Sequence, residues 1–359
     1  MKAAIISLGS KSSRWIADAM RKHFEAVDDI YLKSIEVNLY AGKLDVLYNG
    51  NPLPKYDCVY AKGSFRYTPL LRSITTALSQ QSYMPIRAET FTIGHDKLLT
   101  HLALQLHKIP MPATYLASSP LSAKKILGRV NYPIIMKFPQ GTQGKGVMYA
   151  DSFASASSML DALSALRQPF LIQEYIETGG IDTRAIVVGD KVVASMRRTA
   201  VSGEQRANIH AGGKGEAYEM ETYAKKIAVD AAKVIGADVC GIDILQGPKG
   251  PLVIEANLSP GLQGITAATN LDVAGIIAKF LYQKTKDITE SGKTLTTSKI
   301  LEEASKKPCE SMIDQIVTTL DFRGERILLP KIVSDMAKLN DKKEVVIKSQ
   351  KGRVLIEEC

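Results

Sequence analysis

One stretch of the chain, residues 240–261, constrains the fold most, because it places oxygen-bearing side chains among apolar β-forming residues. It reads CGIDILQGPKGPLVIEANLSPG. The runs CGIDIL and PLVIEANL are joined by QGPKG, a strong turn signal, so the stretch predicts a β-hairpin. Side chains alternate across a strand, so Glu255 and Asn257 share a face, and the partner strand can bring Asp243 opposite them.

These three side chains are candidate metal ligands. Mg²⁺ prefers hard oxygen ligands, and two close carboxylates repel each other unless a cation lies between them. A solvent-facing polar row on an edge hairpin would give the same pattern. The stretch taken alone is therefore compatible with a metal site formed by Asp243, Glu255 and Asn257 and with a plain exposed hairpin.

A glycine-rich turn favours a phosphate site. The segment FPQGTQGKGV lies between two apolar runs. It lacks the GK[ST] of a Walker loop and the GxGxxG with following helix of a dinucleotide fold. Its glycines let backbone N–H groups approach a phosphate, although an ordinary flexible hairpin has the same composition. Lys137 precedes the turn inside the apolar run PIIMKF, where a lysine is costly without an anionic partner.

Two further segments add polar groups. Lys97, in GHDKLL, begins an amphipathic helix, so a solvated helix start is the alternative explanation for it. The run LIQEYI is followed by Asp182, and this order suits a flat purine on the strand-end backbone and a ribose hydroxyl on the acid. Guanidinium groups suit carboxylates and phosphates, whereas an exposed basic strand end would also explain the pair in MRR. The nearby arginines are Arg184, Arg197, Arg198 and Arg206.

Bulk properties narrow the class of protein. The 359 residues carry a net charge of +9, but the lysines and arginines are dispersed, which favours an anionic small substrate over nucleic acid. No apolar run is long enough to span a bilayer, so we expect no membrane partner. The four cysteines show no metal-ligand spacing, and we expect a reducing, cytoplasmic environment.

The pattern of strands and helices predicts four parts. Alternating strands and helices over 1–95 indicate a small α/β domain with a parallel sheet. Hairpins mixed with helices over 96–284 indicate an α+β domain of two subdomains. Residues 285–310 are polar and poorly patterned, which favours a linker, and 311–359 form a small β-rich tail domain.

With these segments in view, the chain resembles an ATP-grasp ligase, and more closely the RimK-type α-L-glutamate ligases. The resemblance runs over about residues 1–284 and is densest from 94 to 265. It is carried by the ordered segments HDKLLT, MKFPQGTQGKGV, LIQEYIETGGID, MRRTAVSGEQRANIHAGG, CGIDIL and IEANLSPGLQGI. The fold it implies is a pre-ATP-grasp α/β domain followed by two α+β subdomains that hold ATP between them.

The resemblance also implies roles for individual residues. The expected nucleotide-binding residues are Lys97, Lys137, Gly141, Gln143, Gly144, Gly146, Glu174, Tyr175, Ile176 and Asp182, with Arg206 and Asn208 touching both nucleotide and acyl phosphate. The expected catalytic residues are Arg206, Asn208, Arg184 and Arg197. Asp243, Glu255 and Asn257 match the metal ligands, for two Mg²⁺ ions with Mn²⁺ as an alternative.

The implied reaction is carboxylate–amine ligation through an acyl phosphate, with L-glutamate as the amine in most relatives. The acceptor would be a protein C-terminus, a pterin or deazaflavin coenzyme, or a carrier protein. Many relatives carry a basic residue at the position of Ala211, and this departure weakens the assignment of glutamate. Arg66 or Arg72 is a candidate to hold an acceptor carboxylate, although either also fits a plain surface role.

The tail resembles an AbrB-type swapped-hairpin domain through the run RILLPK. Such domains form intertwined dimers, and many bind DNA. Residues 311–359 hold nine Lys and Arg against eight Asp and Glu, a balance that favours a homodimer over DNA binding. A nucleotide-responsive DNA-binding regulator is the alternative function.

Overall fold

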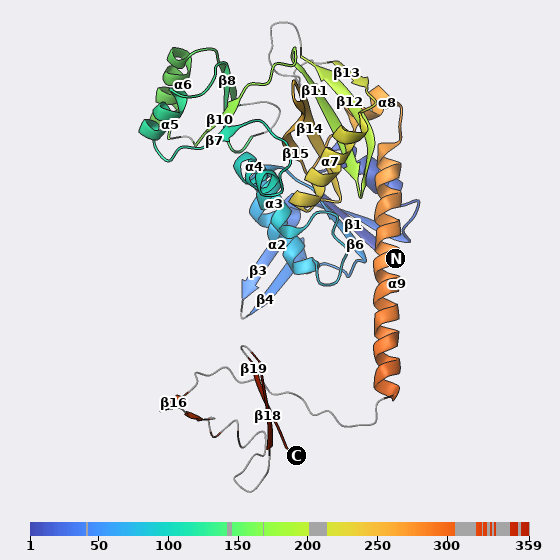
Figure 1. The fold of residues 1–359 in the computed structure, drawn as a ribbon. Helices are drawn as coiled ribbons and strands as arrows, with labels where there is room; N and C mark the ends of the chain where they lie inside the picture. The colour runs from blue at the N-terminus through green and yellow to red at the C-terminus, as the bar shows by residue number, and fades with distance from the viewer. Residues whose placement is uncertain are drawn as a thin grey trace. The chain divides into compact units, whose positions relative to one another are not determined.

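The computed structural model divides the chain into two units, Met1–Thr294 and Leu295–Cys359. It describes residues 1–40, 42–141, 146–167, 169–200 and 214–305, and in the tail 321–324, 326–328, 331, 334, 345–350 and 353–358. Helices and strands are mixed in the first unit, as the sequence predicts (Figure 1).

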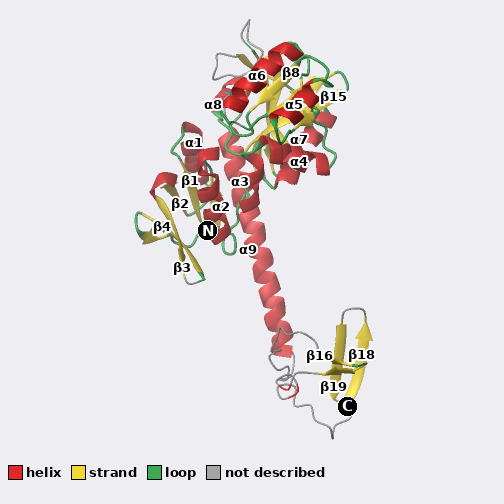
Figure 2. Cartoon of the chain, turned by 90° about the vertical axis from the view of Figure 1, so that its left-hand side faces the viewer, coloured by secondary structure: helices red, strands yellow, loops and turns green. Residues whose placement is uncertain are grey.

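The first part of the chain contains the expected parallel sheet, with strand order β2-β1-β6. The residues Ala3, Ala4, Ile5 and Ile6 of β1 are fully buried, which is the signature of a strand covered on both faces. Helix α1 contacts β1 and β2 (Figure 2). An antiparallel sheet, β3-β4-β5, lies in the same part of the chain and includes β4, which the sequence pattern did not reveal. The elements of this part are β1 (Lys2–Ser7), α1 (Lys11–Met20), β2 (Ala26–Tyr31), η1 (Leu32–Ser34), β3 (Ile35–Tyr40), β4 (Lys43–Tyr48), β5 (Asn51–Pro52), β6 (Cys58–Ala61), η2 (Phe65–Tyr67), α2 (Thr68–Leu78), α3 (Ala88–Gly94) and α4 (Lys97–Leu106).

Two further sheets follow. A four-stranded sheet, β7-β10-β8-β9, carries helices α5 and α6 on one side (green in Figure 1). A five-stranded antiparallel sheet has the order β13-β12-β11-β14-β15, and the hairpin expected over 240–261 is its edge pair β14–β15. The elements are β7 (Thr114–Tyr115), α5 (Pro120–Leu127), β8 (Ile134–Lys137), β9 (Val147–Ala150), α6 (Phe153–Ala165), β10 (Leu171–Glu174), β11 (Ile181–Val188), β12 (Lys191–Thr199), β13 (Lys214–Ala217), α7 (Thr222–Ile235), β14 (Val239–Gly247), β15 (Gly250–Asn257), α8 (Gln263–Thr269) and α9 (Val273–Ser305).

The buried apolar residues form two separate cores. The larger core joins the first part of the chain to the five-stranded sheet and helices α7 to α9, across the boundary expected at residue 95. Polar contacts reinforce this union: the Thr90 hydroxyl donates to the carbonyl of Ile235, and the Asp238 N–H donates to the carbonyl of Pro85. The smaller core lies between the four-stranded sheet and helices α5 and α6.

The end of the chain differs from the expected linker. Helix α9 continues to Ser305, so residues 285–305 are helical rather than irregular. An exposed pair four residues apart, Lys286 with Glu290, gives this helix local support. The tail contains two antiparallel hairpins, β16 (Asp321–Arg323) with β17 (Arg326–Leu328) and β18 (Val345–Gln350) with β19 (Arg353–Glu358).

Across the described residues, no individual helix has the length and apolarity needed to cross a bilayer. One bent pair, Gln263–Thr269 with Val273–Ser291, passes that test on length and composition alone. Val273, Ile277 and Leu281 of this pair belong to the larger core.

Candidate functional site

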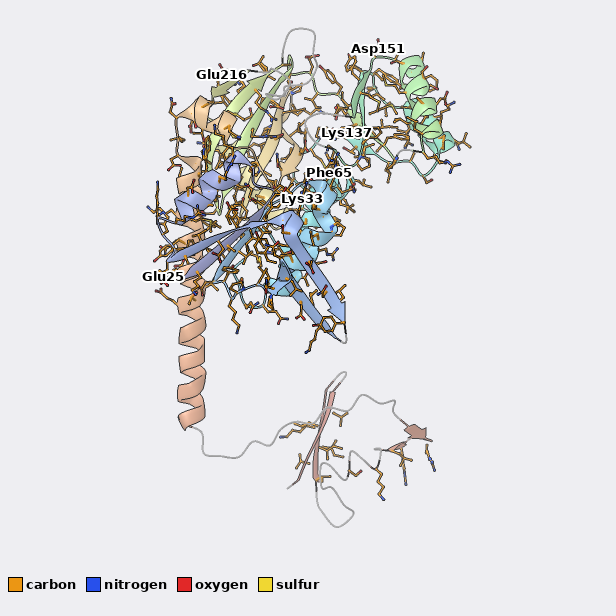
Figure 3. All side chains as sticks on the ribbon, turned by 180° about the vertical axis from the view of Figure 1, so that it is seen from behind. Glu25, Lys33, Phe65, Lys137, Asp151 and Glu216 are labelled. Atoms are coloured by element: carbon orange, nitrogen blue, oxygen red, sulfur yellow. The ribbon has the colours of Figure 1, made fainter. Side chains whose placement is uncertain are left out.

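A cavity of about 660 Å³ lies where the parallel sheet β2-β1-β6, the four-stranded sheet and the five-stranded sheet meet. Its walls come from the ends of β1 and β6, from β8 and β10, and from one face of β11, β12, β14 and β15. Phe65 of the 3-10 helix η2 and Lys137 of strand β8 both line it and lie near each other in Figure 3. The charged Lys, Arg, Asp and Glu residues that line it are Lys62, Lys97, Lys137, Glu174, Asp182, Arg184, Arg198, Asp243 and Glu255.

Strand register gathers five of these groups on one face of the five-stranded sheet. Asp182 pairs with Arg198 across β11–β12, and Arg184 pairs with Asp243 across β11–β14. Asp243 in turn pairs with Glu255 across β14–β15, as the hairpin pattern predicts. Because side chains alternate along each strand, these charges form a continuous row rather than a scatter.

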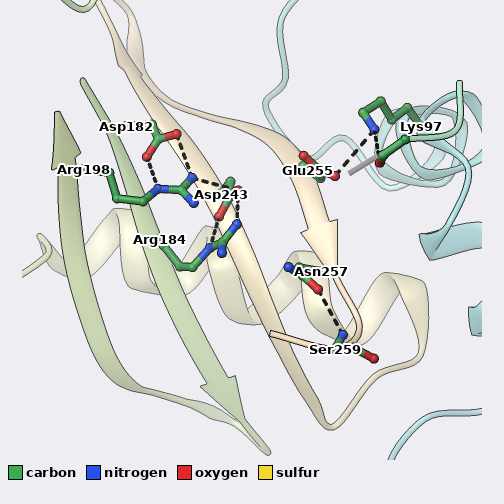
Figure 4. A network of polar contacts seen from close by, with 9 residues as sticks. Lys97, Asp182, Arg184, Arg198, Asp243, Glu255, Asn257 and Ser259 are labelled. Atoms are coloured by element: carbon green, nitrogen blue, oxygen red, sulfur yellow. Dashed lines mark hydrogen bonds and ion pairs between the residues drawn. The ribbon is translucent and has the colours of Figure 1, made fainter. Parts of the chain in front are cut away.

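The row contains a buried network of ion pairs (Figure 4). Both guanidinium nitrogens Nε and Nη2 of Arg184 donate to Asp243, at 2.7 and 2.6 Å. Arg198 donates to the two oxygens of Asp182 at 2.5 and 2.7 Å, and its Nη2 lies 2.9 Å from Oδ2 of Asp243. Asp243 is 3% exposed and Arg198 5% exposed, so these charges depend on each other rather than on water.

The two buried acids titrate differently. Burial acts to raise the pKa of Asp243, but Arg184 and Arg198 outweigh it and hold that pKa below its ordinary value. Burial raises the pKa of Asp182 to about 6, because Arg198 only partly offsets burial and Asp243 adds repulsion. Asp243 is therefore a permanent anion, whereas Asp182 takes up a proton just below neutral pH.

The predicted metal ligands lie together at one end of the row. Asp243 faces Glu255, and Asn257 follows Glu255 by two residues on the same strand face. The Nζ of Lys97 lies 3.5 Å from Glu255, and Oδ1 of Asn257 accepts a hydrogen bond from the N–H of Ser259 at 3.0 Å. In the described part of the chain no group of three or more His, Cys, Asp and Glu side chains could hold a metal ion, so a site here needs the amide oxygen of Asn257.

Lys137 is held by an amide rather than by a carboxylate. It is 6% exposed, and its Nζ donates to Oε1 of Gln173 at 2.7 Å. Gln173 Nε2 lies 3.0 Å from Nε2 of His101, whose Nδ1 lies 2.6 Å from the carbonyl of Lys97. Since a carbonyl only accepts, the proton of His101 belongs on Nδ1, and Gln173 donates to Nε2.

Burial lowers the pKa of both basic side chains in this network. Burial lowers the pKa of His101 to about 4, with a contribution from Lys137. Burial also lowers the pKa of Lys137 to about 8, against the attraction of Glu255. His101 is therefore neutral at pH 7, and Lys137 is a cation that gains from an additional anion in the cavity.

The segment expected to contact a purine lines the cavity next to Lys137. The backbone N–H of Glu174 donates to the carbonyl of Ala113 at 2.9 Å, and its Oε2 accepts from the N–H of Ala113 at 3.1 Å. Tyr175 packs edge-on against Tyr149 with ring centroids 5.2 Å apart. Ile176 is 8% exposed.

Several predicted residues are placed elsewhere or lie outside the described residues. Arg197 lies on the opposite face of β12 from Arg198 and stacks over the ring of Tyr218 at 4.0 Å, so the cavity receives Arg198 instead. Arg66 and Arg72 do not line the cavity. Gln143, Gly144, Arg206, Asn208 and Ala211 lie outside the described residues.

The glycines at the two ends of the phosphate turn are described. The carbonyl of Gly141 accepts from Nζ of Lys97 at 3.2 Å. Gly146 has φ +78°, and a Cβ there would lie 2.2 Å from Cδ2 of Phe138. Only glycine fits this position, because the left-handed conformation and the aromatic contact both exclude a side chain.

Comparisons with known proteins agree with this architecture. The family model described as "RimK-like ATP-grasp domain" matches residues 94–281. A "Probable alpha-L-glutamate ligase" of Thioalkalivibrio sulfidiphilus is 36% identical over 291 residues, which cover 80% of this chain and 97% of that protein. A protein of the same name from Vibrio cholerae is 36% identical over 289 residues, covering 78% and 95%.

A solved structure shows the same fold at low identity. The ATP-grasp ligase PsnB, complexed with minimal precursor, Mg and ADP, superposes with a TM-score of 0.62 over 79% of this chain and 98% of that chain. The two sequences are 19% identical, so the likeness concerns the fold alone.

Proposed function

This chain belongs to the RimK-like ATP-grasp family of ATP-dependent, amide-forming ligases, and we propose that it joins L-glutamate to a carboxylate acceptor. The observation that supports this most is the charged row on the cavity floor beside buried Lys137. A cavity lined by five Lys and Arg against four Asp and Glu suits an anionic nucleotide and an anionic substrate.

The proposed reaction has two steps. The acceptor carboxylate attacks the γ-phosphate of ATP, which gives an acyl phosphate and ADP. The amine of the incoming amino acid then attacks the acyl carbon and expels phosphate, forming the amide. Phosphoryl transfer needs little covalent help from a protein, so positioning and charge neutralisation are the main tasks of the site.

We assign the phosphates to the lysines and the turn. Lys97 and Lys137 project into the cavity from α4 and β8, where they can bind phosphate oxygens. The turn that contains Gly141, Gln143, Gly144 and Gly146 would supply backbone N–H groups. Arg184 and Arg198 would neutralise charge that develops on the transferred group. Arg206 and Asn208 keep their proposed contacts with nucleotide and acyl phosphate.

The base and sugar are assigned to the neighbouring segment. Glu174, Tyr175 and Ile176 would bind adenine at the end of β10. Asp182 would hold a ribose hydroxyl, for which it would have to share its oxygens with Arg198.

The residues of the charged row fit a magnesium site. Glu255 and Asn257 offer one carboxylate and one amide oxygen on a single strand face, and Asp243 lies opposite. Such hard oxygens are suitable ligands when phosphate and water complete the shell. Asp243 would bind a cation only by sharing oxygens that already accept from Arg184 and Arg198. Two Mg²⁺ ions, with Mn²⁺ as an alternative, would neutralise the phosphates when bound.

The function can be tested by phosphate release. The purified chain is supplied with ATP, Mg²⁺, single amino acids and candidate acceptors, and products are followed by their mass shift. We expect release that requires glutamate and an acceptor, and loss of most turnover in Glu255→Gln. The matched control is Glu216→Gln, on β13 of the same sheet but outside the cavity lining. Full turnover in Glu255→Gln would refute the metal assignment.

We further propose that residues 96–284 form the ATP-grasp domain, and that 311–359 form an AbrB-like domain that makes the protein a homodimer. The apolar side chains of the β18–β19 hairpin support this: Ile347 is 63% exposed and Val354 60% exposed. A two-stranded hairpin is marginally stable alone, so a second copy is a suitable cover. The balanced charge of the tail gives no support to the DNA-binding alternative.

Light scattering on the full chain tests the dimer. Ile347→Glu should convert dimer to monomer, whereas Leu106→Glu, at an exposed apolar position on α4, should leave the mass unchanged. A monomeric wild-type chain would refute the proposal.

A further inference from the structure

Lys62 lies at the carboxyl edge of the parallel sheet in the first part of the chain. In the register of β1 and β6, Ile6 pairs with Ala61, so Ser7 and Lys62 both leave the sheet at the same edge. Helix α1 starts four residues beyond Ser7, after a turn at Gly9 with φ +71°. Open α/β sheets bind ligands in such a crevice beyond the carboxyl ends of parallel strands.

Lys62 is buried without a counter-charge. It is 3% exposed and lines the cavity. Among the described residues its Nζ has no hydrogen-bond or ion-pair partner, and its one contact of note is the ring of Tyr60 at 5.3 Å. The other two cavity lysines differ, since Lys137 donates to Gln173 and Lys97 lies near Glu255. An ammonium group buried in this way is costly unless an anion completes it.

The first turn of α1 adds to the positive field beside Lys62. The Ser10 hydroxyl caps the helix by accepting from the N–H of Ser13, and both residues line the cavity. The first turn holds no acidic residue that would offset the positive end of the helix dipole. The helix N-terminus and the buried ammonium group beside it together form a binding site for an anion.

The position of Lys62 favours binding of the acceptor over binding of the nucleotide. The N–H of Gly63 donates to the Ser259 hydroxyl at 3.0 Å, and that hydroxyl donates back to the carbonyl of Gly63 at 3.1 Å. Lys62 is thereby fixed next to the strand end that carries Asn257, while the proposed phosphate lysines project from α4 and β8. Burial lowers the pKa of Lys62 to about 8, so at pH 7 it is a cation that gains from an anion beside it. Because Lys62 stands apart from the lysines proposed to bind phosphate, it suits a carboxylate that does not take part in phosphoryl transfer.

We propose that Lys62 and the first turn of α1 bind a second, non-reacting carboxylate of the acceptor, which is therefore at least a dicarboxylate, such as a chain that ends in glutamate. This inference rests on the proposed ligase function. It replaces Arg66 and Arg72 as the groups that hold the acceptor, because neither lines the cavity.

Calorimetric titration of the full chain saturated with ADP and Mg²⁺ tests the site without turnover. The probe is L-glutamyl-L-glutamate, and L-glutaminyl-L-glutamine amide is its counterpart without carboxylates. Wild-type protein should bind the acidic dipeptide and not the amide. Lys62→Met should weaken binding of the acidic dipeptide by about 10- to 100-fold, the range of a hydrogen bond between charged groups, and change the Kd of ADP less than about 2-fold.

Controls separate the outcomes. Arg66→Met, four residues along the chain and exposed, should bind the dipeptide like the wild type. Lys62→Met removes a buried unpaired charge and should not lower the thermal midpoint, which verifies that it folds. Equal dipeptide binding in Lys62→Met and wild type, no dipeptide binding by the wild type, or an equal loss of ADP affinity overturns the inference. Competition by inorganic phosphate at the same concentration as the dipeptide would show a phosphate site and also overturn it. Failure of the wild type to bind ADP would instead refute the ligase function.

Discussion

Removal of Arg198 should expose how strongly the buried charges depend on each other. Arg198→Met leaves Asp182 buried without the guanidinium that binds both its oxygens. Loss of one partner from a buried ion pair costs about 3–5 kcal/mol. Asp243 keeps Arg184, so the penalty falls mainly on Asp182.

The penalty should depend on pH. The pKa of Asp182 is already about 6 in the presence of Arg198, and it rises further without it. Protonation of Asp182 then removes the unpaired charge. The free energy of unfolding lost in Arg198→Met should therefore shrink by about 1.4 kcal/mol for each pH unit from pH 8 down to pH 6. Replacing both partners, in Arg198→Met with Asp182→Asn, should recover most of the loss because no buried charge is left alone.

Urea unfolding at pH 6 and pH 8 measures these differences. The only tryptophan, Trp15, packs against the larger core, which includes the five-stranded sheet. Its fluorescence therefore reports on unfolding of the core that carries Arg198. Arg197→Met is the matched control: it loses only a stack on Tyr218, worth about 0.5–2 kcal/mol. The reasoning fails if Arg198→Met costs no more than Arg197→Met, or if the double variant is no more stable than the single one.

Three further outcomes follow from the site. Gln173→Leu removes the hydrogen-bond partner of Lys137 and should weaken ATP binding by about 5- to 100-fold in a filter-binding or calorimetric assay, with an unchanged far-UV spectrum. Gly146→Ala should lower the free energy of unfolding by about 1–3 kcal/mol in urea, because it needs a left-handed conformation and meets Phe138; a neutral effect would mean that the turn can rearrange. The raised pKa of Asp182 means that the folded protein holds this proton more tightly than the unfolded chain, so the stability it contributes is present below about pH 4 and is lost as the pH rises through about 6. Wild type should therefore gain thermal midpoint relative to Asp182→Asn between pH 7 and pH 5, and a constant difference would contradict the raised pKa.

The sequence predicted the residues of the β14–β15 hairpin better than those that the neighbouring strands add to the cavity. The alternation of Glu255 and Asn257, with a turn of fixed length, was enough to place Asp243 opposite Glu255. The choice between Arg197 and Arg198 needed the register of β12 against β11, which depends on tertiary pairing and not on local pattern.

Buried polar residues were predicted unevenly. Lys137 was recognised because it interrupts an apolar run, and the same signal is present at Gln173 in LIQE and at Lys62 after CVYA. Their roles depend on the fold: Gln173 meets His101 of α4, and Lys62 lies in the crevice beyond β1, and neither surrounding can be predicted from local sequence. The helical continuation to Ser305 could not be predicted, because its apolar residues do not recur at a helical period.

The separation into two cores has a consequence for how the molecule responds to nucleotide. Lys137 belongs to the sheet of the smaller core, whereas Lys97, Asp243 and Glu255 belong to elements of the larger one. Two bodies with separate apolar interiors can open independently, so each has its own local unfolding equilibrium. A triphosphate that contacts both lysines would make the two open together. In that case the substrate would act as a structural tie, and the cooperativity of the fold would itself report whether the site is filled.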